Sequence, residues 1–210
     1  MNDKEIIKKA AHYFSKKVIE FGDSPKGVDW NSIDSQLIRL SQVIKLIDGK
    51  DRFSINDLGC GNGQLIEKIK TDLFPEFRYI GSDISKEMID LSTLKYKSDE
   101  RVKFIHIQKV SDIPVCDFTI ASGIFNMKLS INVADWEKYI FNTLSIMNEK
   151  STKGFSFNML TSYSDKEKMR DDLYYADPCI IFDFCKKNFS KNISLLHDYD
   201  LYDFTIIIRK

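Results

Sequence analysis

The chain has 210 residues, the size of one domain, and its 31 lysine and arginine residues balance 31 aspartate and glutamate residues, so the formal net charge is zero. Proteins that bind nucleic-acid backbones or anionic membranes rely on an excess of positive charge, so this balance argues against both partners. No run approaches the roughly 18 apolar residues of a membrane span, and the charged start of the chain does not resemble a secretory signal.

The four cysteines form no C-x-x-C pair, and no histidine lies at zinc-ligand spacing from them. We therefore expect no bound metal. Reduced thiols are typical of a cytoplasmic protein, which is the expected location.

Two amphipathic helices are predicted before the first strand. Apolar residues recur at helical spacing through 3–20, and a break rich in glycine follows. A second apolar stripe predicts a helix from about 31 to 47. We expect residues 1–50 to form a helical cap or lid and residues 51–210 to form the core, within one structural domain.

From residue 53 onward, short apolar runs alternate with amphipathic stretches, which is typical of a parallel sheet covered by helices. The predicted elements are strand 53–58, helix 63–72, strand 78–83, helix 86–95, strands 102–107 and 117–122, helix 135–147, strand 154–159, helix 180–187, and strands 193–197 and 204–208. The last two strands are separated by a short turn region, which predicts an antiparallel hairpin at a sheet edge. The expected fold class is α/β: a Rossmann-like, seven-stranded, mostly parallel sheet with an antiparallel last strand and an N-terminal helical cap.

The most informative segment joins the first strand to the next helix through Gly59, Gly61 and Gly63. Glycines in such a turn permit positive φ, let a ligand approach the backbone, and let the helix begin close to the strand. The dinucleotide fingerprint G-x-G-x-x-G would require glycine at position 64, where this chain has Gln64. The loop therefore favours a ligand other than a dinucleotide pyrophosphate.

Two carboxylates flank this loop. Asp83 ends the next predicted strand, about 20 residues after Gly63, where an acid can accept hydrogen bonds from both ribose hydroxyls. Asp57 precedes the glycines, where its charge disfavours a phosphate and favours a cation. An adenosine that carries a positive charge in place of phosphates is S-adenosylmethionine.

Residues 57–63, Asp-Leu-Gly-Cys-Gly-Asn-Gly, and 81–85, Gly-Ser-Asp-Ile-Ser, resemble the first two cofactor motifs of class I S-adenosylmethionine-dependent methyltransferases. The resemblance covers about residues 53–160 and extends to the terminal hairpin. It implies S-adenosylmethionine as cofactor and S-adenosylhomocysteine as product. The implied contacts are the methionine part at Asp57, Gly59, Cys60, Gly61 and Gly63, the ribose at Asp83, and the adenine at Ile84.

Further cofactor contacts are expected outside these motifs. After the third strand, where the family often has an aspartate that binds the adenine amino group, this chain has Gln108, and Asp112 is the alternative. Ser122 follows the fourth strand, at the position that usually lines both methyl donor and acceptor. Arg39 is expected to bind the cofactor carboxylate, which its fork-shaped guanidinium fits, the alternative being a surface ion pair. Tyr13 is expected to close over the cofactor, the alternative being simple packing on the sheet.

The acceptor is expected to be a small molecule. The chain lacks Asn-Pro-Pro-Tyr after the fourth strand, which counts against methylation of DNA amino groups. Segments 27–32, 122–126 and 154–158 resemble small bacterial methyltransferases associated with surface-polysaccharide gene clusters, which implies O-methylation of a sugar or a surface-glycan precursor. The expected acceptor contacts are Trp30, Phe125, Asn126, Asn158 and Tyr175.

Methyl transfer from a sulfonium is an in-line displacement, so positioning supplies much of the acceleration, and a protein base is needed only if the acceptor must lose a proton. His197, which precedes the hairpin turn and is followed by Asp198, is the candidate base. Three alternatives stay open: an N-methyltransferase of a small molecule, a catalytically silent regulatory protein that binds the cofactor, and an NAD-dependent oxidoreductase. Gln64 and the terminal hairpin disfavour the last.

Overall fold

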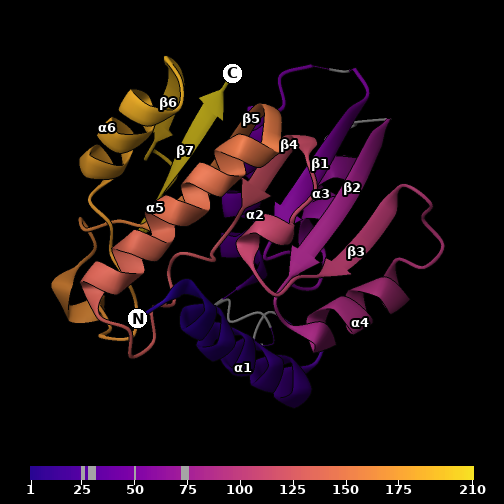
Figure 1. Ribbon diagram of the computed structural model, residues 1–210, viewed down its shortest axis with the longest axis horizontal. Coiled ribbons are helices and arrows are strands. Elements are labelled where there is room, and N and C mark those ends of the chain that lie inside the picture. The colour runs from indigo at the N-terminus through magenta and orange to yellow at the C-terminus, as the bar shows by residue number, and fades with distance from the viewer. Residues whose placement is uncertain (25–26, 28–31, 50, 72–75) are drawn as a thin grey trace.

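The structure, a computed structural model, describes residues 1–24, 27, 32–49, 51–71 and 76–210 (Figure 1). Its strands are β1 (Phe53–Leu58), β2 (Phe77–Asp83), β3 (Val102–His106), β4 (Cys116–Ala121), β5 (Ser151–Leu160), β6 (Asn192–Leu196) and β7 (Asp203–Arg209). Its helices are α1 (Asp3–Phe21), α2 (Ile33–Val43) with the 3-10 turn η2 (Ile44–Leu46), α3 (Gln64–Thr71), α4 (Lys86–Lys95), η3 (Val110–Asp112), α5 (Val133–Lys150), η4 (Lys166–Lys168) and α6 (Pro178–Asn188).

The strands form one seven-stranded sheet in the order β3-β2-β1-β4-β5-β7-β6. The pairs from β3 to β5 are parallel, and β7 runs antiparallel to both β5 and β6. The predicted α/β fold class is confirmed, and so is the antiparallel edge hairpin. β2 lies on one side of β1 and β4 lies on the other, so the strand order reverses at β1. Open α/β sheets bind their ligands at such a switch point.

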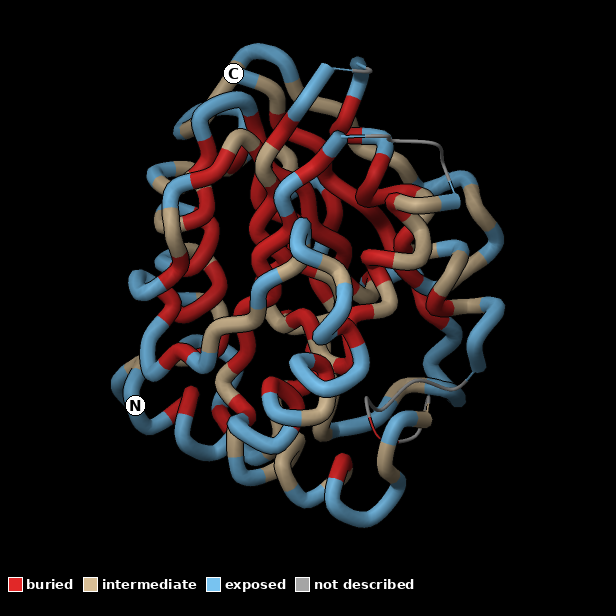
Figure 2. The backbone as a smooth tube through the Cα atoms, turned by 90° about the vertical axis from the view of Figure 1, so that its right-hand side faces the viewer, coloured by how far each residue is buried: buried red, intermediate tan, exposed pale blue. Residues whose placement is uncertain are grey.

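Helices cover both faces of the sheet. One face packs against α5 and α6, and α5 crosses in front of the strands in Figure 1. The other face packs against α2, η2 and α3, with Leu40, Val43 and Leu65 buried among strand residues. Figure 2 shows that the buried backbone runs through the middle of the molecule and that exposed turns surround it. Neither layer of helices covers the carboxyl ends of the parallel strands.

The first helix joins the core on the side of α5 through Ile6 and Ile7. It begins with a capping box, in which the Asn2 side chain accepts from the Glu5 backbone and the Glu5 side chain accepts from the Asn2 backbone. It then lies across the lower end of the molecule in Figure 1, beneath the carboxyl ends of β1 and β2. The second helix and the 3-10 turn η2 pack into the core, where Val43 and Leu46 are fully buried. It is also shorter than predicted, ending at Val43 and continuing as a 3-10 turn.

Candidate active site

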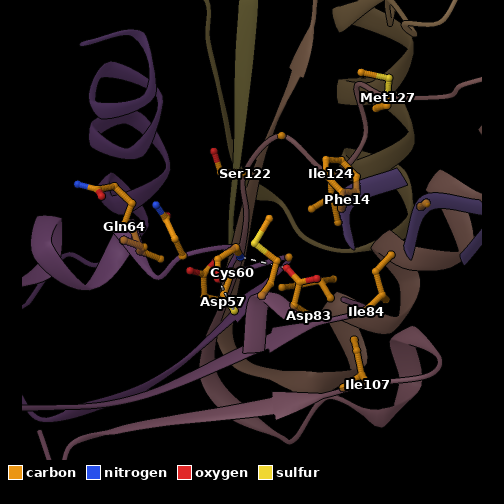
Figure 3. Close-up of a pocket in the computed structure, with 18 of the residues that line it drawn as sticks. Phe14, Asp57, Cys60, Gln64, Asp83, Ile84, Ile107, Ser122, Ile124 and Met127 are labelled. Atoms are coloured by element: carbon orange, nitrogen blue, oxygen red, sulfur yellow. Dashed lines mark hydrogen bonds between the residues drawn. The ribbon is translucent and has the colours of Figure 1, made fainter. Parts of the chain in front are cut away.

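A pocket opens at the switch point between the carboxyl ends of β1 and β4 (Figure 3). Its floor is the glycine loop, one wall is formed by the residues that follow β2 and β3, and the opposite wall by those that follow β4. Helices α1 and α2 contribute Phe14, Gln36 and Leu40 to the cover. The predicted lid therefore takes part in the site through both helices.

The glycine loop requires glycine for steric reasons. Gly59, Gly61 and Gly63 have φ values of 75°, 50° and 76°, in the left-handed region. A Cβ on Gly59 would lie 2.2 Å from the Cγ2 atom of Ile124, and one on Gly63 would lie 2.7 Å from the ring of Tyr96. The backbone of this loop is thus open to a ligand on one side and tightly packed on the other.

Asp83 holds the loop in place. Its Oδ2 accepts from the Gly61 backbone N–H at 3.0 Å, and its Oδ1 accepts from the Ser85 N–H at 2.8 Å. Burial raises the pKa of this carboxyl, and these hydrogen bonds oppose the rise. Because each carboxylate oxygen has further lone pairs, Asp83 can also accept from the hydroxyls of a ribose in the pocket.

Asp57 is the second carboxylate of the floor. It is 4% exposed and accepts a 2.6 Å hydrogen bond from the Tyr79 hydroxyl. Burial raises the pKa of Asp57 to about 7, and the nearby charge of Asp83 adds to the rise. A cationic ligand offsets the cost of ionising both acids, so this floor suits a sulfonium or an ammonium.

The wall beyond Asp83 is apolar, which suits the face of a flat ring such as adenine. Ile84, Met88, Ile107 and Val110 line it, and Figure 3 shows Ile84 beside Asp83 and Ile107 below both. Gln108 is exposed, and its backbone N–H donates to the Asp112 carboxylate at 3.2 Å. Its expected contact with an adenine amino group stays a prediction.

The wall after β4 is built on Asn158. Ser122, Gly123 and Ile124 line the pocket, and Asn158, fully buried on β5, accepts from the Gly123 N–H and donates to the Ser122 hydroxyl. Asn126 is similarly engaged, since its side-chain oxygen accepts from the Leu160 N–H. These two amides support the pocket wall from behind, and their expected contacts with the acceptor stay predictions.

Phe125 lies in the core. It is fully buried, its ring contacts Phe157 at a centroid distance of 5.7 Å, and its carbonyl accepts from the Trp136 indole N–H. The residues after a strand do not all point the same way, and here Ile124 and Met127 face the pocket while Phe125 points into the core. Phe125 is therefore a packing residue, which corrects the expectation that it contacts the acceptor.

Two expected cofactor contacts on the lid lie elsewhere. Arg39 forms a 2.6 Å ion pair with the fully buried carboxylate of Asp203 at the start of β7. The ring of Tyr13 packs edge-on against Phe14, and it is Phe14 that lines the pocket. The Arg39 pair is buried and not the surface ion pair of the alternative, and the ring contact of Tyr13 is with its own helix and not with the sheet, so the expected cofactor contacts of both residues stay predictions.

His197 and Tyr175 lie outside the pocket. His197 follows β6, three strands from β4, which at the usual strand spacing is about 14 Å. Its exposed ring contacts Tyr163 and Phe204. Tyr175 lines a different cleft, between α5 and α6, and its hydroxyl accepts from the Arg170 N–H. Trp30 is outside the described residues.

Several pocket residues were not predicted, and they share an apolar or amide side chain without a motif around it. They are Ala10, Gln36, Leu40, Met88, Ile107, Val110, Met127, Trp136 and Tyr139. Only Gln36 carried a signal in the sequence, because it is a polar residue one turn before Leu40 on an apolar stripe. Within the described part of the chain, no group of three or more potential metal ligands occurs, and no helix is long and apolar enough to cross a membrane.

Comparisons with known proteins agree with this geometry. Residues 55–149 match the family model described as a methyltransferase domain. The chain is 46% identical over 167 residues to Rv1506c of Mycobacterium tuberculosis, which is named as a methyltransferase, and the match covers 80% of this chain and 99% of that protein.

Solved structures give the same fold. Magnesium protoporphyrin IX methyltransferase of Synechocystis with bound S-adenosylmethionine superposes with a TM-score of 0.63 at 15% identity, over 100% of this chain and 98% of that one. The N-methyltransferase NodS of Bradyrhizobium japonicum with S-adenosylhomocysteine gives 0.64 at 13% identity, over 99% and 98%. The glycines, the two acids and the apolar slot fit the cofactor these proteins hold, which decides against the nicotinamide alternative. The chain belongs to the S-adenosylmethionine-dependent methyltransferases.

Proposed function

We propose that this enzyme methylates a hydroxyl oxygen of a small molecule, a sugar or a surface-glycan precursor, in the cytoplasm. The observation that carries the proposal is the covered pocket: α1 and α2 reach over the glycine loop, so the acceptor must enter beneath a helical lid. A folded nucleic acid or protein surface does not fit such an enclosure. The neutral charge of the chain agrees, since it offers no basic excess for a polyanion.

Two residues, Ser15 and Asp23, make polar contacts that join the lid to the rest of the protein. The Ser15 hydroxyl on α1 lies 2.9 Å from the Ser85 hydroxyl and also donates to Glu87, next to the Asp83 loop. Beyond the helix, Asp23 accepts from the Asn62 side chain at 2.8 Å and pairs with Lys95. The lid is thus fastened to the two loops that are expected to hold the cofactor, and it excludes water from the reaction.

The chain's own part in the reaction is positioning. When bound, S-adenosylmethionine supplies a methyl group on a positively charged sulfur. We propose that Asp57 and Asp83 hold the cationic end and the ribose, with Ile84 and Ile107 on the adenine, so that the methyl group points toward the wall after β4. Holding the acceptor oxygen in line with the methyl group and the sulfur then converts an encounter into an intramolecular displacement.

The role of His197 changes with the geometry. At about 14 Å from the end of β4, it cannot reach the oxygen that is methylated unless the acceptor or the chain shifts. We propose instead that His197 contacts the far end of an acceptor that extends over β5 and β7. Replacing His197 with alanine should then raise KM and leave kcat unchanged.

The experiment is a panel of nucleotide sugars, glycan precursors, small amines and oligonucleotides, each incubated with enzyme and S-adenosylmethionine while S-adenosylhomocysteine is quantified. The proposal expects product with hydroxylated sugar acceptors only. Turnover of an amine that lacks a hydroxyl would establish the N-methyltransferase alternative. Cofactor binding without turnover on any acceptor would favour the catalytically silent alternative.

A further inference from the structure

Two turns meet at the end of the sheet where the pocket opens. β5 runs parallel to β4, and β5 and β6 both run antiparallel to β7, so the chain leaves β5 and β6 at the same end as it leaves β4. The Thr161 N–H donates to the Tyr202 carbonyl at 3.1 Å, and the Lys168 ammonium donates to the Tyr202 hydroxyl at 3.0 Å. The segments 161–168 and 197–202 therefore form one surface, which we call the rim.

The rim presents aromatic rings to solvent. Tyr163 is 69% exposed and Tyr202 is 38% exposed. The Tyr163 ring lies beside the ring of His197, at a centroid distance of 6.0 Å, and His197 packs edge-on against the fully buried Phe204. Tyr163 is thus supported from the core and remains open to a ligand. Neighbouring exposed rings of this kind mark a binding surface more strongly than a single exposed side chain does.

Carboxylates accompany the rings on the rim. The two segments hold four acidic residues, at positions 165, 167, 198 and 200, and two lysines, at 166 and 168, so their net charge is −2 with His197 neutral. Lys168 pairs with Asp165 at 3.2 Å. Carboxylate oxygens accept hydrogen bonds from hydroxyls, and they repel phosphates. The rim therefore favours a hydroxylated ligand over a phosphorylated one.

An exposed aromatic ring next to carboxylates matches the chemistry of a sugar. A pyranose has an apolar face of C–H groups, which packs on an aromatic ring, and hydroxyls around its edge, which donate to carboxylate oxygens. A nucleobase would also stack on the ring, but the phosphates of its nucleotide would then lie close to the acidic residues of the rim. An uncharged saccharide suits this surface better than a nucleotide sugar does.

The rim lies too far from the expected methyl group for one sugar to reach both. β5 adjoins β4, and β7 separates β5 from β6, so His197 is about 14 Å from the end of β4 at the usual strand spacing. A pyranose ring is shorter than this separation. An acceptor that contacts both the rim and the wall after β4 therefore contains more than one sugar unit.

We propose that the Tyr163 ring, with His197 beside it, binds a sugar unit of the acceptor that is remote from the unit that is methylated. The substrate class is then an uncharged oligosaccharide, in preference to a monosaccharide or a nucleotide sugar. This inference rests on the proposed function, because it takes the acceptor to be a sugar. It adds Tyr163 to the contact proposed for His197.

The test compares acceptors of one to four sugar units. The panel contains neutral oligomers of glucose, galactose, mannose, rhamnose and N-acetylglucosamine, and the matching nucleotide sugars. The wild-type KM should fall as the chain grows beyond one unit, and nucleotide sugars should be the poorer acceptors. Tyr163→Ala should raise KM for the longer acceptors about 3- to 10-fold, the range for one aromatic contact, and should leave kcat unchanged. Its KM for single sugars should equal that of the wild type.

Two variants serve as controls. Tyr163→Phe keeps the ring and should match the wild type on every acceptor. Leu94→Ala removes an apolar side chain of α4 that is also 69% exposed and does not line the pocket, and it should leave KM unchanged. Calorimetric binding of S-adenosylhomocysteine shows whether each variant keeps its cofactor site.

A KM that does not depend on chain length, a Tyr163→Ala variant equal to the wild type on the longer acceptors, or a preference for nucleotide sugars would overturn the inference and leave the proposed function in place. Turnover confined to acceptors without a sugar would overturn both. If nothing in the panel is methylated, saturation-transfer NMR of the same oligosaccharides with the S-adenosylhomocysteine complex decides. Binding that Tyr163→Ala abolishes would support the rim as a sugar site, and absence of binding to the wild type would overturn it.

Discussion

Tyr79 and Asp57 are joined by a 2.6 Å hydrogen bond inside the protein, with the hydroxyl donating to a carboxylate that is only 4% exposed. The pair lies directly beneath the glycine loop and faces a second buried acid, Asp83. The protein thus keeps two carboxylates in a place where ionising them is unfavourable without a cation. This relationship links the stability of the free enzyme to its affinity for a cationic cofactor.

Asp57 should make the ligand-free protein less stable as the pH rises. Its pKa is about 7 when folded and near 3.8 when unfolded. Below about pH 4 the carboxyl is neutral in both states; between 4 and 7 the unfolded chain releases its proton while the folded protein keeps it, so the free energy of unfolding falls. Asp57→Asn should therefore exceed the wild type in stability at pH 8, by a few kcal/mol at most, and match it near pH 4.

Urea unfolding without cofactor at both pH values measures this difference, and Tyr79→Phe is the companion variant because it removes only the hydrogen bond to the carboxylate. If Asp57→Asn and the wild type differ equally at the two pH values, the carboxyl does not titrate as described.

Asp83→Asn should weaken the binding of every ligand that contains the nucleoside. The substitution leaves one acceptor oxygen where Gly61 and Ser85 both require one, so the loop loses a hydrogen bond and the ribose loses an acceptor. The loss expected for both S-adenosylhomocysteine and 5′-methylthioadenosine is about 10-fold or more, measured by calorimetry. Asp183→Asn, at an exposed carboxyl of α6 that pairs with Lys187, is the control; a loss confined to S-adenosylhomocysteine would contradict the ribose assignment.

Arg39→Met should damage stability and leave the cofactor site intact. The guanidinium is the ion-pair partner of Asp203, which is fully buried, so its removal leaves a buried charge and is expected to lower the free energy of unfolding by about 3–5 kcal/mol. Adding Asp203→Asn should recover much of that loss. Folded Arg39→Met should bind S-adenosylhomocysteine as the wild type does; loss of binding there would restore Arg39 as a cofactor contact.

Ser15→Ala should loosen the lid. The variant removes the hydrogen bonds from α1 to Ser85 and Glu87 and leaves the pocket wall unchanged. Because each such bond contributes about 1 kcal/mol, S-adenosylhomocysteine should dissociate several-fold faster with little change in association rate, as measured by stopped-flow fluorescence. Ser145→Ala removes a comparable serine hydroxyl at an exposed position of α5 that does not line the pocket. An unchanged dissociation rate in Ser15→Ala would mean that α1 does not limit release.

The fold could be predicted from the sequence because its signals are local. The alternation of apolar runs with amphipathic stretches marked every strand of the sheet, and the glycines with Asp83 marked the pocket floor. The first turn of α2 was less clear, since Ile33 matches the apolar stripe and yet is 54% exposed.

The sequence did not predict where residues lie when their position depends on the order of the strands in the sheet. The hairpin could have added either strand next to β5, and because β7 takes that place, β6 and His197 move to the edge. The direction of the side chains after β4 and on β5 was equally hidden, so Phe125 after β4 and Asn158 on β5 were expected in the pocket and lie behind it. Gln36 was given no role because an isolated amide on a helix does not by itself indicate a ligand.

The most direct test of the central claim, methyl transfer to a hydroxyl of a small acceptor, is the chemical shift of the transferred carbon. The wild-type enzyme is incubated with S-adenosylmethionine carrying a 13C-labelled methyl group and with an acceptor that supports turnover, and the product is examined by NMR. The account predicts a single O-methyl resonance on a sugar or glycan precursor. An N-methyl resonance, or label in a nucleic acid, would contradict it.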